Sequence, residues 1–178
     1  MDERPLALLG FMGAGKTTLG AALAQRSGRR FVDLDEAVEA AIGQPISRIF
    51  ATQGERAFRD AELRVLNALL TERSAAPLVI AFGGGTFAQP DVRQLCEQRG
   101  VQTLWLRVPW EILRARLDAP EERAKRPLTR SGEESLKRLL DEREALYALA
   151  QGSVDASGPV EVVLDRILAW EEACETSR

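Results

Sequence analysis

The sequence predicts an α/β fold in which helices cover both faces of a parallel sheet. Short apolar runs, typical of strands, alternate with longer segments whose apolar residues recur at helical spacing. A complete Gly-x-x-x-x-Gly-Lys-[Ser/Thr] pattern lies between the first such strand and the first such helix, at residues 10–17. The 178 residues contain no internal repeat or low-complexity linker, so we expect a single domain over residues 1–178.

The expected strands are short apolar runs, most of which are followed by a helical pattern. They cover residues 6–9, 31–34, 78–82, 101–108 and 153–155. The first helix is expected to begin at Lys16, and later helices are expected at 36–42, 46–51, 55–73, 91–99, 110–117, 133–150 and 160–170. Asp35 stands where the N-cap of the second helix is expected. We expect a helical insert at about residues 33–62.

A polar segment at about residues 118–132 differs from its surroundings, because it is rich in charge and contains Pro120 and Pro127. It is too polar to form part of a core. We therefore expect it to be a mobile lid over a binding site.

The composition excludes several kinds of function. A net charge of −3 gives no general attraction to nucleic acid or to an anionic membrane, and no apolar run reaches the roughly 18 residues of a membrane span. Without histidine, a histidine-based catalytic triad is impossible, and a general base would have to be a carboxylate or a less usual group. Two distant cysteines favour neither a disulfide framework nor a zinc site, and no export signal is visible. We expect a cytoplasmic protein.

The phosphate loop predicts a site for a nucleoside triphosphate with Mg²⁺. Its glycines let backbone N–H groups turn toward phosphate oxygens, and the following helix adds its positive N-terminal end. Lys16 is expected to reach the β- and γ-phosphates, and the Thr17 hydroxyl to bind Mg²⁺. The expected nucleotide-binding residues here are Gly13, Ala14, Gly15, Lys16, Thr17 and Thr18. The Asn-Lys-x-Asp signature of guanine binding is absent, because the single asparagine, Asn67, is followed by alanine.

Charged residues at the ends of expected elements are candidates for holding a second substrate. Each also has a structural explanation, since Asp35 suits a helix cap, Arg59 suits ion pairs along its own helix, and Arg126 and Arg143 suit an exposed surface. The glycines at 83–85 are harder to explain structurally. Three adjacent residues without side chains weaken a fold unless the backbone must turn sharply or be approached closely by a ligand.

Together these segments resemble the shikimate kinase family over nearly the whole chain. The stretches that carry the resemblance, in family order and at about family spacing, are GFMGAGKTT, DLDEAVE, IFATQGERAFRDAE, FGGGTF, KRPL and DEREALY. The resemblance implies a P-loop fold of the nucleoside monophosphate kinase type, with a five-stranded parallel sheet, a substrate-binding insert and a lid. It also implies transfer of a phosphoryl group from ATP, with Mg²⁺, to the 3-hydroxyl of shikimate, in the pathway to chorismate and the aromatic amino acids.

The resemblance further implies roles for individual residues. Asp35 would contact the ring hydroxyls of shikimate, and Arg59 and Arg143 would hold its carboxylate. Gly84, the middle glycine of Gly83, Gly84 and Gly85, would touch the substrate. Arg126 would reach the phosphates from the lid. The expected catalytic residues are Lys16, Asp35 and Arg126. Asp33 would support Mg²⁺ through water, and Arg116 would stack on adenine. Further positions along the family's pocket are Ile46, Phe50, Phe58, Glu62 and Leu128.

Two alternatives stay open at the level of sequence. One is another small-metabolite P-loop kinase, such as a gluconate or nucleoside monophosphate kinase. The other is a catalytically silent nucleotide-binding module with a regulatory function. For the favoured interpretation we expect a monomer whose partner is the small molecule shikimate, without nucleic acid or membrane.

Overall fold

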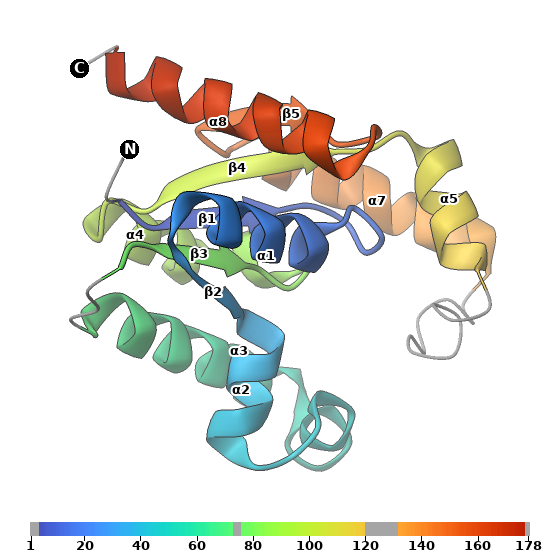
Figure 1. The fold of residues 1–178 in the computed structure, drawn as a ribbon. Coiled ribbons are helices and arrows are strands. Elements are labelled where there is room, and N and C mark those ends of the chain that lie inside the picture. The colour runs from blue at the N-terminus through green and yellow to red at the C-terminus, as the bar shows by residue number, and fades with distance from the viewer. Residues whose placement is uncertain (1–3, 73–75, 120–131, 177–178) are drawn as a thin grey trace.

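The computed structural model describes residues 4–72, 76–119 and 132–176. Within them, five parallel strands form one sheet in the order β2-β3-β1-β4-β5 (Figure 1). The strands are β1 Leu6–Leu9, β2 Arg30–Asp33, β3 Leu78–Ala81, β4 Gln102–Arg107 and β5 Gly152–Asp155. The helices are α1 Lys16–Ser27, α2 Leu34–Ile42, α3 Ile46–Thr71, the short 3-10 turn η1 Thr86–Ala88, α4 Pro90–Gln98, α5 Trp110–Asp118, α7 Glu133–Tyr147 and α8 Val160–Thr176. The predicted α/β fold is confirmed, and most element ends lie within two residues of their expected positions.

The central strands carry the core of the sheet. Every residue of β1 and of β3 is buried, as expected for strands covered on both faces. β1 pairs with β3 on one side and with β4 on the other, so that Leu6 lies beside Val79 and Gln102. Helices α1 and α8 lie on one face of the sheet, and α4 and α7 lie on the other (Figure 1). This arrangement leaves the carboxyl ends of the strands at one edge, where ligands of such sheets bind.

The predicted cap of α2 is wrong. The N-cap is Asp33, whose Oδ1 accepts the backbone N–H of Asp35 at 3.1 Å, and Asp35 is the second residue of the helix. Strand β2 ends at Asp33 and α2 begins at Leu34, so no loop residue separates the two elements. The carboxylate of Asp35 is therefore left for another task.

Helix α3 is interrupted at Gly54. There the backbone takes φ 81° and ψ 172°, outside the helical region, and a glycine tolerates that positive φ more easily than other residues. The sequence predicts two helices, at 46–51 and 55–73, and the break between them is confirmed. The first part lies beside α2, and together they form a lobe below the sheet in Figure 1. Most of the predicted lid, including Arg126, lies outside the described residues.

A buried ion pair joins residues far apart in the chain. Arg29, just before β2, binds Glu171 of α8 through two hydrogen bonds of 2.6 and 3.1 Å. Only 2% of the Arg29 side chain and 4% of the Glu171 side chain are exposed. The pair fixes the last helix against the first crossover of the sheet.

Among the described residues, no helix is long and apolar enough to cross a membrane.

Candidate active site

The phosphate loop at residues 10–17 follows β1, and its last two residues are the first two of α1. Gly13 and Gly15 have φ values of 81° and 91°, and Gly15 is the left-handed N-cap from which α1 starts at Lys16. The Lys16 ammonium donates to the carbonyl oxygens of Gly10 at 2.8 Å and Phe11 at 3.0 Å. A positive charge and the N-terminal end of a helix thus meet in one loop, and both favour phosphate oxygens there.

Thr17 connects this loop to the end of β2. Its hydroxyl donates to Asp33 Oδ2 at 2.8 Å, while the other carboxylate oxygen of Asp33 caps α2. One hydroxyl and one carboxylate suit Mg²⁺, which prefers oxygen ligands and keeps several waters. No cluster of three or more potential metal ligands occurs in the described ranges, so phosphate and water would supply the remaining ligands. The residues present fit Mg²⁺ bound together with a nucleotide, as the sequence predicts.

Asp35 projects toward the glycine segment, which we define as Gly83–Gly85. Burial and then the negative charges of Asp33 and Glu62 raise the pKa of its carboxyl, against the opposing effects of Lys16 and Arg59, to about 6. A carboxylate with this pKa remains ionised above about pH 6 and is a better proton acceptor than an exposed one. Such a group suits general-base chemistry.

Each glycine of the segment is approached closely by one predicted substrate-binding side chain. A Cβ atom added at Gly83 would lie 2.6 Å from Asp35 Oδ1. At Gly84 it would lie 2.7 Å from Nη1 of Arg143, and at Gly85 it would lie 2.7 Å from Nη2 of Arg59. None of the three glycines has a positive φ, so the segment is needed for close approach and not for an unusual backbone conformation. Asp35, Arg59 and Arg143 come from α2, α3 and α7, and the fold brings them together here.

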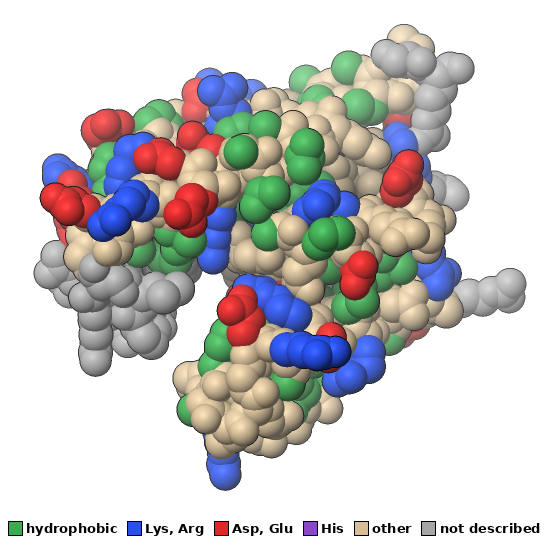
Figure 2. Space-filling view, turned by 180° about the vertical axis from the view of Figure 1, so that it is seen from behind, with side chains coloured by type: hydrophobic (Ala, Val, Ile, Leu, Met, Phe, Trp, Pro, Cys, Tyr) green, Lys and Arg blue, Asp and Glu red, His purple; other side chains and the backbone are tan. Residues whose placement is uncertain are grey.

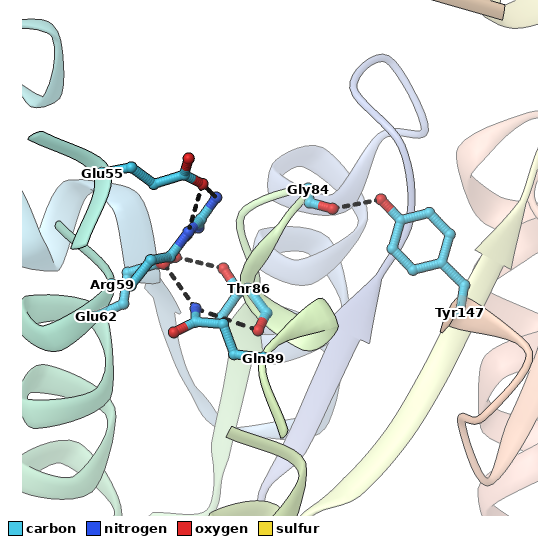
Figure 3. Close-up of polar contacts among 7 residues, drawn as sticks. All are labelled: Glu55, Arg59, Glu62, Gly84, Thr86, Gln89 and Tyr147. Atoms are coloured by element: carbon cyan, nitrogen blue, oxygen red, sulfur yellow. Dashed lines mark hydrogen bonds and ion pairs between the residues drawn. The ribbon is translucent and has the colours of Figure 1, made fainter. Parts of the chain in front are cut away.

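Glu62 organises the α3 side of this group (Figure 3). Its side chain is fully buried and accepts hydrogen bonds from Arg59 at 2.6 Å and from Thr86 at 2.5 Å. A third bond comes from the Gln89 amide at 2.9 Å. Arg59 also pairs with the exposed Glu55 at 3.1 Å, so the predicted ion pairs along its helix exist as well. Glu62 therefore ties the guanidinium to the turn that follows the glycine segment.

An open cleft separates the lobe of α2 and α3 from the part of the molecule that carries α7 (Figure 2). Arg143 approaches the phosphate loop as well, since its guanidinium carbon lies 5.8 Å from the centre of the Phe11 ring. The ring of Phe58, beside Arg59, lies 4.9 Å from that of Phe50. The two arginines thus reach the glycine segment from helices on either side.

The remaining predicted nucleotide residues are placed as follows. Thr18 is exposed on the first turn of α1. Arg116, on α5, donates to the Gly13 carbonyl at 3.0 Å and to the Ala156 carbonyl at 3.4 Å, which joins the phosphate loop to the loop after β5. Arg126 lies outside the described residues, and its position is not tested.

Sequence reasoning missed three residues. Thr86 and Gln89 bind Glu62, and the Tyr147 hydroxyl donates to the Gly84 carbonyl at 2.6 Å. A signal for Tyr147 was present, because it is the only tyrosine and stands four residues after Arg143, on the same helical face. No local signal points to Thr86 or Gln89, since their partner lies on another helix.

The fold and site together define a P-loop kinase of the nucleoside monophosphate kinase type. A family model described as shikimate kinase matches residues 12–170. A curated relative named shikimate kinase, from Nitrobacter winogradskyi, is 40% identical over 168 residues, covering 93% of this chain and 75% of the relative. The chain belongs to the shikimate kinase family.

Solved structures agree with this family. A shikimate kinase from Acinetobacter baumannii in complex with shikimate superimposes with a TM-score of 0.83 and 33% identity, covering 96% of this chain and 93% of that one. A gluconokinase from Sinorhizobium meliloti gives a TM-score of 0.63 at 19% identity, covering 94% of this chain and 90% of that one. The second likeness shows only a shared fold.

Proposed function

We propose that the chain transfers the γ-phosphoryl group of ATP to the 3-hydroxyl of shikimate, giving shikimate 3-phosphate and ADP for the synthesis of chorismate and the aromatic amino acids. Membership of the shikimate kinase family supports this function. The observation that carries it in the structure is the convergence of Asp35, Arg59 and Arg143 on the three glycines at 83–85. One carboxylate and two guanidinium groups suit an acceptor that has a hydroxyl and an acid group.

On the nucleotide side, the phosphate loop binds the phosphates and Lys16 leaves its carbonyl partners to neutralise them. Thr17 and, through water, Asp33 would hold Mg²⁺, which would further neutralise the phosphate charge. Arg116 lies between the phosphate loop and the loop after β5, where we place the adenine. Arg126 contributes a positive charge from the lid.

On the acceptor side, Arg59 and Arg143 bind the carboxylate of shikimate, and the absence of side chains at Gly83–Gly85 lets its ring approach the backbone. Asp35 accepts or orients the proton of the attacking hydroxyl, for which its raised pKa is suited. Positioning and charge neutralisation then account for most of the rate, as in other phosphoryl transfers.

We also propose the finer features of the protein. It acts as a cytoplasmic monomer without nucleic acid or membrane partners, in keeping with its net charge of −3. Acidic and basic side chains are interspersed on the face seen in Figure 2. Residues 1–178 form one domain, with the substrate-binding insert at about 33–62 and the lid at about 118–132.

The test is a coupled assay of ADP release with shikimate, gluconate and a nucleoside monophosphate as acceptors. We expect release that depends on shikimate and is severely reduced in Lys16→Met, because the phosphates lose a charge in a site of low polarity. Preference for gluconate or a nucleotide would assign another kinase, and no acceptor-dependent release would indicate a silent module.

Arg59→Ala and Arg143→Ala should each weaken shikimate binding by about 2–4 kcal/mol in calorimetry, with much smaller effects on ATP.

A further inference from the structure

Tyr147 is a buried side chain for which the proposed reaction has no direct use. It ends α7, only 2% of it is exposed, and its ring lies 6.0 Å from that of Trp105. Its hydroxyl donates to the Gly84 carbonyl at 2.6 Å (Figure 3). Burial raises the pKa of the phenol to about 12, so the group stays a hydrogen-bond donor at neutral pH.

Two side chains of α7 meet the same glycine. A Cβ atom on Gly84 would lie 2.7 Å from Arg143 Nη1 and 3.6 Å from the Tyr147 hydroxyl. The two residues are four apart in the helix and therefore share one face. One contact is a fixed hydrogen bond from a rigid ring, and the other comes from the end of a long, flexible side chain.

The glycine segment has no side chains of its own by which the fold can fix it. On the α3 side it is continued by Thr86, which is bound to the buried Glu62. On the α7 side the hydrogen bond from Tyr147 holds the Gly84 carbonyl. The two fixed points lie on opposite sides of the segment in Figure 3. The backbone N–H groups of Thr86 and Ala88 donate to the carbonyls of Gly83 and Gly85, whereas the Gly84 carbonyl accepts from the Tyr147 side chain.

We propose that Tyr147 is a positioning residue for the acceptor: its hydrogen bond fixes the distance between the Gly84 peptide and the Arg143 guanidinium. The inference rests on the proposed function, in which the acceptor carboxylate binds Arg143 beside Gly84. A guanidinium binds a carboxylate through hydrogen bonds of defined geometry, and small misplacements of a binding group weaken recognition strongly. Tyr147 thus acts on the acceptor through Arg143 without touching it.

The variant Tyr147→Phe keeps the ring and removes only the hydroxyl. We expect the KM for shikimate to rise about tenfold, while kcat and the KM for ATP stay within about threefold, because nucleotide contacts lie elsewhere. Thr103→Val is the matched control. It removes a hydroxyl that accepts the backbone N–H of Gln151 at 3.0 Å, away from the glycine segment. Thr103→Val should lower the melting temperature by about as much as Tyr147→Phe does, and it should leave the KM values for shikimate and ATP unchanged.

A double-mutant cycle with Arg143→Ala shows whether the effect passes through that arginine. In the Arg143→Ala background, Tyr147→Phe should change kcat/KM for shikimate by less than about twofold. The positioning role is overturned by an unchanged KM in Tyr147→Phe, by a full tenfold effect without Arg143, or by equal losses for ATP and shikimate. Those results leave the proposed function intact. A wild-type chain that does not phosphorylate shikimate would instead refute the function and the positioning role together.

Discussion

The Asp33 carboxylate caps α2 by accepting the backbone N–H of Asp35 at 3.1 Å, and it also accepts the Thr17 hydroxyl at 2.8 Å. One aspartate thereby joins the end of β2, the start of α2 and the phosphate loop. Asp35 is relieved of any capping role. Its carboxylate lies beside the glycine segment, where burial and the charges of Asp33 and Glu62 disfavour its ionised form. Capping of α2 therefore does not explain its presence.

The variant Asp35→Asn separates a contribution of Asp35 to catalysis from a contribution to stability. We expect turnover to fall at least about 100-fold, the usual scale for general-base assistance, because the amide cannot accept the proton. The melting temperature at pH 8 should stay level or rise, since the variant removes a buried charge that is repelled by Asp33 and Glu62. Near-normal turnover in a variant that melts like the wild type would remove Asp35 from the reaction.

The activity should depend on pH through Asp35. Its carboxyl, with a pKa of about 6, becomes protonated at lower pH, so kcat/KM for shikimate should fall about tenfold per pH unit below that value. The chain has no histidine, so no imidazole titrates in this range. A profile recorded from pH 5 to 8 checks this, and the acidic limb should be missing from the residual activity of Asp35→Asn.

Stability should follow the opposite direction. The folded-state pKa lies above the ordinary 3.8, so protonated Asp35 favours the folded state. That contribution is complete below about pH 3.8 and is lost as the pH rises through about 6. Denaturant melts of wild type and Asp35→Asn should therefore differ increasingly in favour of the variant as the pH passes from 5 to 7. A constant difference across this range would contradict the raised pKa.

Glu62→Gln and Glu55→Gln form a matched pair, because both carboxylates bind Arg59. Glu62 is fully buried and makes three hydrogen bonds, whereas 66% of the Glu55 side chain is exposed. Glu62→Gln should cost about 1–3 kcal/mol of stability and raise the KM for shikimate at least tenfold, since the amide carries no negative charge for Arg59 and keeps only one of the two oxygens that accept from Arg59, Gln89 and Thr86. Glu55→Gln should cost less than about 0.5 kcal/mol. Denaturant melts and shikimate titrations decide, and equal effects of the two variants would contradict the role of Glu62.

Alanine substitutions in the glycine segment should impair binding more than folding. In Gly85→Ala the new methyl would lie 2.7 Å from the Arg59 guanidinium, which has to move away from the acceptor. We expect shikimate affinity to drop at least tenfold with little change in melting, because the end of a flexible side chain can shift. Gly100→Ala is the reverse control. Gly100 has φ 64° and no neighbour within 4 Å of an added Cβ atom, so its substitution should cost about 1 kcal/mol of stability and leave shikimate binding unchanged.

Much of the fold could be predicted because its signals are local. The apolar runs of β1 and β3 and the break at Gly54 follow directly from residue type and spacing. The cap of α2 could not, because Asp33 and Asp35 are equally good capping residues two positions apart. The end of β2 at Asp33 fixes the choice, and only the fold brings the Thr17 hydroxyl to that carboxylate.

Only part of the site was predicted from the sequence. Its charged members were found through the family resemblance, and the structure brings Asp35, Arg59 and Arg143 together. Their roles, and that of Arg126, stay predictions. The residues that hold the site in place were missed, because Thr86 and Tyr147 act through contacts between separate elements. Spacing along one helix indicates that Glu62 can pair with Arg59, yet nothing local shows that it is buried.

We expect the buried Arg29–Glu171 pair to affect how the chain folds during synthesis. Glu171 is synthesised 142 residues after Arg29. A buried guanidinium without its partner is strongly unfavourable, so burial of Arg29 is disfavoured before α8 is available. We therefore expect α8 to dock against the residues before β2 late in translation.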